Sequence, residues 1–236
     1  MTESEWLACV DPQTMLEFLR AKATDRKLRL FAVAVSRRFL LLTHDQRVSE
    51  ALDIAEQFAD GLIGDMERSN ARRAAQQAAQ VRGVVARPVA PKWERRAASL
   101  SYYAAARQAM EAAWNIPSLA VEVLVWREGG YNTCDWQAIK THEGVIQSNL
   151  LRDIFGNPFR QTRLDPSWLN WNEGTVVNLA QTIYEERAFG LLPVLADALE
   201  DAGCTSDELL AHCELPFTFP VPPAFDRGTH PHLPSK

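Results

Sequence analysis

A histidine and a cysteine stand side by side near the end of the sequence, at His212 and Cys213. A cysteine thiol becomes a nucleophile when a nearby base takes its proton, and imidazole commonly serves as that base. Neighbouring helical residues point about 100° apart, so this pair cannot easily share a hydrogen bond. The base would have to come from elsewhere, for example His142 or Glu185. A hydrolase or metal-dependent enzyme built around His212 and Cys213 is therefore the third functional hypothesis.

Zinc is the metal whose ligands the sequence could supply. Cys204, Cys213, His142 and His212 are a thiolate and imidazole set of the right kind, but no two of them have ligand spacing along the chain. Buried thiols and a hydrogen-bonded helix histidine are the favoured interpretation. The common signatures of nucleotide, dinucleotide, zinc-protease and serine-hydrolase sites are missing. The sequence thus predicts no metal and no cofactor, and it favours a non-enzyme.

The most suggestive chemistry lies between Arg68 and Arg107, where nine basic residues accompany one acid, Glu94. Arginines on a helix can neutralise phosphates while interleaved aromatic rings stack on unpaired bases. This is the second hypothesis, a nucleic-acid-associated protein whose polyanion-binding residues are Arg72, Arg73, Arg82, Arg95, Arg96 and Arg107. Against it stands the isoelectric point of about 5.6 for the whole chain.

The charge is divided unevenly along the chain. Residues 1–110 carry 17 basic and 13 acidic side chains, whereas residues 111–236 carry 8 basic and 17 acidic ones. The basic segment could therefore bind a polyanion or pack against the acidic half of its own chain. Carboxylates at Glu185, Glu186, Asp197, Glu200 and Asp201 are expected to form a solvated acidic face.

The elements that must position these residues are helical. We expect an all-α fold, a single domain of about nine to eleven helices over residues 1–214, with a possible hinge at 83–91 and a proline-rich tail at 215–236. Residues 26–42 predict the central helix, since Leu28 to Val35 is apolar almost all round. If the chain has two lobes, the seam is expected at 83–91.

Later helices are predicted from caps and periodicity. A helix from Trp93 to Trp114 is expected to close at 115–117, and residues 119–126 are assigned to a short buried helix despite their β-branched side chains. Thr2 with Glu5 has the spacing of a first capping box, and Thr205 with Glu208 that of a second. The next long helix is expected to end at a turn through Gly156. One face of it carries an apolar ladder, which consists of Ile139, Ile146, Leu150 and Ile154. We expect Phe155 and Phe159 to anchor the turn in the core.

The cellular setting follows from what the chain contains. No apolar run reaches the roughly 18 residues of a membrane span, and the first residues are acidic where a signal peptide is basic. The four cysteines form no Cys-x-x-Cys pair, which indicates reduced thiols. We expect a cytoplasmic protein without a membrane partner.

Several motifs together resemble a family of uncharacterised bacterial proteins that occur as many paralogues within one genome. They are Glu5-Trp-Leu-Ala-Cys9 with Asp11-Pro12, Asp25-Arg-Lys-Leu-Arg-Leu-Phe31 with Arg37-Arg38, Leu151-Arg-Asp-Ile-Phe-Gly-Asn-Pro-Phe-Arg160, Ile183-Tyr-Glu-Glu-Arg-Ala-Phe189, Leu192-Pro-Val-Leu-Ala-Asp-Ala-Leu-Glu-Asp-Ala-Gly-Cys204 and Ala211-His-Cys213. The resemblance covers most of the chain. That family has no assigned activity, so the resemblance implies no mechanism.

Two positions depart from the family pattern. Where members usually carry a cysteine-rich run before the arginine pair, this chain has Val33, Val35 and Ser36, and a proline-rich tail follows Cys213. The first departure argues against a metal-binding role that all members of the family share. The first functional hypothesis is therefore a non-enzymatic adaptor with a protein partner, whose basic helices and proline-rich tail offer separate contact surfaces.

Overall fold

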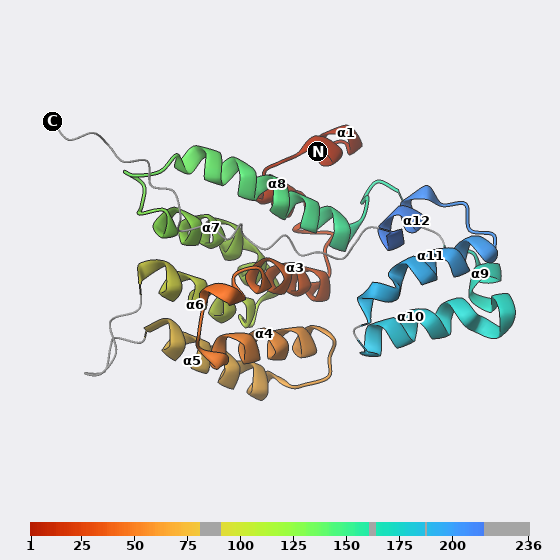
Figure 1. The fold of residues 1–236 in the computed structure, drawn as a ribbon, viewed down its shortest axis with the longest axis horizontal. Helices are drawn as coiled ribbons and strands as arrows, with labels where there is room; N and C mark the ends of the chain where they lie inside the picture. Colours follow the sequence, from red (N-terminus) through yellow and green to blue (C-terminus); the bar gives the residue numbers. More distant parts are fainter. Residues whose placement is uncertain (81–90, 161–163, 187, 215–236) are drawn as a thin grey trace, which may run out of the picture. The chain divides into compact units, whose positions relative to one another are not determined.

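The computed structural model describes residues 1–80, 91–160, 164–186 and 188–214. These residues form α-helices and short 3-10 turns with no strand among them, which confirms the expected all-α fold (Figure 1). Among the described residues the α-helices number twelve, or eleven without the five-residue α9 (Pro166–Asn170), close to the expected nine to eleven. Within the described ranges, no helix is both long and apolar enough to cross a membrane.

The chain separates into two compact units, whose boundary falls between Gly156 and Asn157. The helices on either side of the expected 83–91 seam, α5 and α6, pack against each other within the first unit. Small buried side chains, Ala75 and Ala78 on α5 with Ala97 on α6, allow that packing. The units therefore divide elsewhere than the seam we expected, and residues 83–90 themselves lie outside the described residues.

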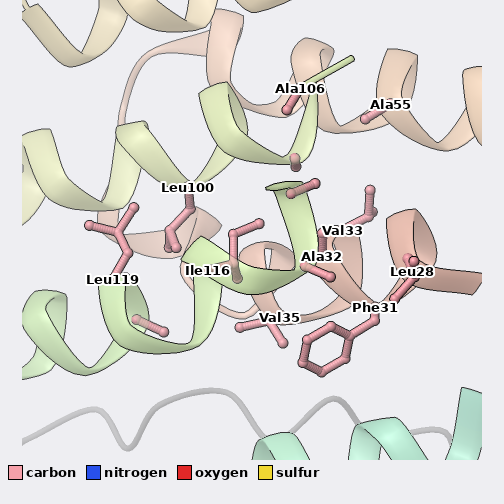
Figure 2. Packing of buried hydrophobic residues seen from close by; sticks show 14 of the residues in the cluster. Leu28, Phe31, Ala32, Val33, Val35, Ala55, Leu100, Ala106, Ile116 and Leu119 are labelled. Carbon is pink, nitrogen blue, oxygen red and sulfur yellow. The ribbon is translucent and has the colours of Figure 1, made fainter. Parts of the chain in front are cut away.

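The first unit is built around α3, which packs against α4, α6, α7 and α8. Phe31, Ala32 and Val35 of α3 are fully buried, and Figure 2 shows them beside Ile116 of α7. The prediction of α3 as the central helix is confirmed. The elements of this unit are α1 (Glu3–Ala8), α2 (Pro12–Leu19), α3 (Asp25–Arg37), η1 (Leu40–Leu42), α4 (Gln46–Ala59), α5 (Asp65–Gln80), α6 (Lys92–Ala104), α7 (Ala109–Arg127) and α8 (Trp136–Phe155).

Local sequence signals set most helix starts. Thr2 and Glu5 form the expected capping box, and the Asp11 carboxylate accepts a hydrogen bond from the Gln13 amide ahead of α2. The carboxylate of Asp135 likewise accepts from the Ala138 amide at the start of α8. Each cap satisfies a backbone donor that the first helical turn leaves unpaired.

The junction of α6 and α7 differs from the expectation. We expected one helix to close at 115–117, but α6 ends at Ala104 and α7 runs unbroken through Pro117. Residues 119–126 are helical as predicted, although as part of this longer helix. The break is thus about ten residues earlier than the proline suggested.

Two buried arginines explain this early break. The Arg29 guanidinium donates to the carbonyls of Ala104 at 3.1 Å, Ala106 at 2.6 Å and Arg107 at 3.1 Å. Arg68 donates to the remaining carbonyl, that of Ala105, at 2.6 Å. Four successive carbonyls therefore have a donor where no helix supplies one.

The two guanidinium groups share a desolvated environment. Both lie over the Phe58 ring, at 4.9 Å for Arg29 and 5.5 Å for Arg68. Burial, and secondarily the charge of Arg68, lower the pKa of Arg29 to about 10. Arg29 therefore remains charged at neutral pH, and its charge faces carbonyl dipoles.

The second difference from the sequence prediction is the polar face that α8 buries. The buried residues of this helix are Glu143, Gly144, Gln147, Ser148 and Leu151, whereas the apolar ladder of Ile139, Ile146, Leu150 and Ile154 is only half-buried. The expectation that the ladder marks one helix face is met only in part. Leu150 and Ile154 pack against the core, but the fully buried face is the polar one, because a buried ion pair fixes the rotation of the helix.

That ion pair joins α3 to α8. Arg38 and Glu143, each 1% exposed at the side chain, form two parallel hydrogen bonds, one of them 2.9 Å from Nη2 to Oε2. Gln147 donates to the same carboxylate at 2.8 Å. A Cβ on Gly144 would lie 2.6 Å from the Val10 carbonyl oxygen, so only glycine lets the segment before α2 approach α8 this closely.

The second unit has a small core of its own. Val176 and Ile183 of α10 pack with Leu195 and Leu199 of α11. Its elements are α9 (Pro166–Asn170), η2 (Trp171–Gly174), α10 (Thr175–Glu186), η3 (Phe189–Leu191), α11 (Leu192–Asp201) and α12 (Asp207–Glu214). The Ser206 hydroxyl accepts from the Leu209 amide at 3.4 Å ahead of α12, whereas the Glu208 side chain, on which the second capping box depends, lies outside the described residues.

The corner between the units has only one of the two anchors we expected. Gly156, at φ +68°, ends α8 and donates to the Arg152 carbonyl at 2.7 Å. Phe155 packs against the core of the first unit, but Phe159 is 40% exposed. The prediction that both phenylalanines are pinned in the core is wrong for Phe159.

Replacing Arg29 by methionine is expected to destabilise the fold by about 2–4 kcal/mol, because two buried carbonyls and one part-buried carbonyl lose their donor. The free energy of unfolding from urea titration measures this. The matched control is Arg26→Met on the same helix, which removes a half-exposed ion pair with Asp60 and is expected to cost less than about 1 kcal/mol. Equal losses for the two variants would contradict the capping role.

Replacing Glu143 by glutamine is expected to cost about 3–5 kcal/mol, because the charge of Arg38 stays buried without its carboxylate. The double variant Arg38→Met with Glu143→Leu should cost less than the single one, since it removes both charges. Denaturation of the three proteins under one set of conditions makes the comparison. A double variant that is less stable than Glu143→Gln would show that the ion pair itself provides the stability.

Candidate functional site

His212 and Cys213 face opposite environments. Both lie on α12, where Cys213 is 6% exposed in the core of the second unit and His212 is exposed to solvent. Desolvation by burial, and then the nearby Cys204, raise the pKa of the Cys213 thiol. A protonated, buried thiol is a poor nucleophile. The Glu185 carboxylate, considered as a partner, instead accepts from Gln181 at 2.7 Å.

The zinc set considered from the sequence is divided between the two units. His142 lies on α8 of the first unit, while Cys204, His212 and Cys213 belong to the second. In the part of the chain that the structure describes, no three His, Cys, Asp or Glu side chains are placed to hold a metal ion. The two buried cysteines contribute to a hydrophobic core instead.

The basic segment contacts the acidic part of its own chain. Arg72 pairs with Glu111 at 2.8 Å and lies 4.4 Å from the Tyr102 ring centroid. Arg96 pairs with Glu122 at 3.1 Å. Both carboxylates are on α7, so two of the six proposed polyanion-binding arginines are already neutralised within the unit.

The structure does not place the other four arginines together on one surface. Arg73 is exposed and donates to Asn70 at 2.5 Å, Arg95 is half-buried, and Arg107 is exposed with its carbonyl bound by Arg29. Arg82 lies outside the described residues. The first arginine of the segment, Arg68, is 4% exposed and donates to a carbonyl of the α6–α7 junction. Of the two alternatives open from the sequence, the contacts favour internal packing.

A partly exposed group of aromatic side chains was missed by the sequence reasoning. We call Trp126, Tyr131 and Trp136 the aromatic triad. The ring of Tyr131 is edge-on to both indoles, with centroids 6.2 Å from Trp126 and 5.9 Å from Trp136. Tyr131 is 45% exposed. The sequence contained a signal for this group, since the three aromatic residues fall within eleven positions around Gly129-Gly130.

A second surface lies on the second unit. Val177 and Tyr184 are exposed and seven residues apart on α10, so they share one side of that helix. Leu191 and Val194, at the start of α11, are also exposed. Exposed carboxylates lie on or next to the same two helices, and we call these apolar and acidic side chains together the acidic face; its acids are Glu173, Glu185, Glu186, Asp197, Glu200 and Asp201.

Comparison with known proteins gives no relative: no family model, no curated protein and no solved structure matches this chain. The resemblance to an uncharacterised bacterial family stays a prediction. The surfaces of this molecule are therefore the basis for inferring its function.

The environment of the thiols predicts their reactivity. At pH 8 in the native protein, iodoacetamide is expected to modify the half-buried Cys9 and Cys134 well before the buried Cys204 and Cys213. Peptide mass spectrometry over a time course measures the order, and labelling in urea shows that all four can react. Preferential modification of Cys213 in the native state would restore it as a nucleophile.

Proposed function

We propose that this protein is a non-enzymatic interaction module and that its second unit binds a basic partner through the acidic face. The observation that carries the proposal is the coincidence of exposed apolar side chains and unbalanced negative charge on the same helices. Residues 157–219 contain ten acidic and three basic side chains. The first unit, residues 1–156, is close to balanced, with 20 basic and 19 acidic side chains.

The apolar part of this surface supplies affinity. Val177, Tyr184, Leu191 and Val194 are between 41% and 52% exposed, although the same helices bury Val176, Ile183 and Leu195. Aromatic and branched side chains in the centre of an interface provide most of its binding energy. A partner that covers these four side chains removes apolar area from water.

The acidic part supplies selectivity. Exposed carboxylates on both α10 and α11 favour cationic partners and repel anionic ones. An amphipathic helix with lysine or arginine beside its apolar stripe meets both requirements. The acidity also disfavours nucleic acid as the ligand of this unit, since phosphates would face like charge.

The probe that tests this proposal is a synthetic lysine and leucine amphipathic helix of about 18 residues. The full-length protein is expected to bind it, and binding should weaken as salt is raised because the charges are screened. Replacing Val177 and Val194 together by aspartate should weaken binding at least about tenfold. Isothermal titration calorimetry measures both effects.

The matched control is Leu62→Asp, which changes another exposed apolar side chain, 73% exposed in the turn between α4 and α5 of the first unit. This variant should bind the peptide as the unmodified protein does. Equal binding by all three proteins would assign the peptide to another surface. No binding by any of them would refute the acidic face as a site for basic helices.

A further inference from the structure

The aromatic triad is held rigidly by its surroundings. One side of the Trp126 ring carries the Lys92 ammonium, 3.1 Å from the ring centroid. A Cβ on Gly130 would lie 3.0 Å from the same indole, so the backbone of the turn packs directly on the ring. Gly129 and Gly130 have φ of +97° and +108°, which other residues rarely adopt. The turn between α7 and α8 thus fixes the position of Tyr131 between two indoles.

Rigid, partly exposed rings are suited to one kind of ligand. Proline-rich segments in the polyproline II conformation bind to surfaces lined by tryptophan and tyrosine, because their rings pack flat on aromatic faces and lose little entropy on binding. Pre-organised aromatic side chains likewise pay little entropy. In the triad, the Tyr131 ring lies 6.2 Å from the Trp126 ring and 5.9 Å from the Trp136 ring.

This chain carries a ligand of that chemistry. Residues 215–225 contain four of its thirteen prolines and no charged side chain, and residues 219–223 read Phe-Pro-Val-Pro-Pro. The spacing of Pro220 and Pro223 is the Pro-x-x-Pro pattern of polyproline II ligands. We propose that the aromatic triad is a binding site for the proline-rich segment Phe219–Pro223 of this chain.

Single-stranded nucleic acid is the other ligand that stacks on exposed rings, and the charges near the triad disfavour it. Lys92 already contacts the face of Trp126. Glu128 and Asp135, which flank the turn, are exposed and would repel phosphates. A neutral peptide meets no such repulsion, so the surroundings favour the proline-rich segment.

The four tyrosines of the chain allow a direct test by ¹⁹F NMR of the full-length protein containing 3-fluorotyrosine. Tyr131→Phe assigns the triad signal. Replacing Pro220, Pro222 and Pro223 by alanine should move the Tyr131 resonance by more than its linewidth. The signals of Tyr102, Tyr103 and Tyr184 should stay in place and serve as internal controls.

A synthetic peptide of residues 215–225, added to this triple variant, should return the Tyr131 resonance saturably towards its original position. Adding Trp136→Ala to the triple variant should weaken binding of the peptide at least about tenfold. Trp114→Ala, which changes an exposed indole elsewhere on α7, should have no effect. Circular dichroism verifies that each variant is folded. If Trp136→Ala unfolds, Trp136→Phe takes its place, and this variant should retain binding.

A Tyr131 signal that is unchanged in the triple variant and under excess peptide would overturn the proposal. A response to oligothymidylate in place of the peptide would overturn it as well and would assign the triad to nucleic acid. The test is separate from that of the acidic face, because Tyr184 reports on the second unit and Tyr131 on the first. Failure of one proposal therefore leaves the other standing.

Discussion

The arrangement of the first unit depends on two arginines buried at the junction of α6 and α7. Four carbonyls in succession, from Ala104 to Arg107, have their donors in Arg29 and Arg68. A buried carbonyl without a donor costs free energy comparable to a lost hydrogen bond, so a chain cannot change direction inside a core without such partners. Guanidinium suits this task because it has five donors in one plane and stays charged. The central helix α3 and the outer helix α5 each supply one of these groups, and both are thereby tied to the junction.

The same use of charge explains why a strongly basic segment need not be a polyanion site. Arg68 serves backbone carbonyls, while Arg72 and Arg96 meet carboxylates on α7. Arg38 is paired with Glu143 deeper in the unit. These four arginines of the N-terminal half therefore have carbonyl or carboxylate partners within the first unit. The charge imbalance that remains belongs to the second unit, where acidic side chains outnumber basic ones ten to three.

Two surfaces differ from the ordinary polar exterior of a helical protein. The acidic face combines apolar side chains with carboxylates, and the aromatic triad concentrates three rings at one turn. Neither contains a nucleophile with a nearby base, and both have the composition of recognition surfaces. Two separate contact surfaces of different chemistry are consistent with an adaptor, whose function is to bring ligands together.

The sequence by itself determined the helical fold, the helix caps and the central position of α3, because 3.6-residue periodicity and capping act within a few neighbouring residues. It did not place the break at the α6–α7 junction or the polar inward face of α8. Those features arise from hydrogen bonds between residues far apart, 75 positions for Arg29 with Ala104 and 105 for Arg38 with Glu143. The sequence also indicated a buried Cys213 that points away from His212, whereas only the tertiary structure showed that Arg72 and Arg96 pair with the carboxylates of α7. Local patterns cannot encode such pairings, because a side chain's partner depends on which helices the whole fold brings into contact.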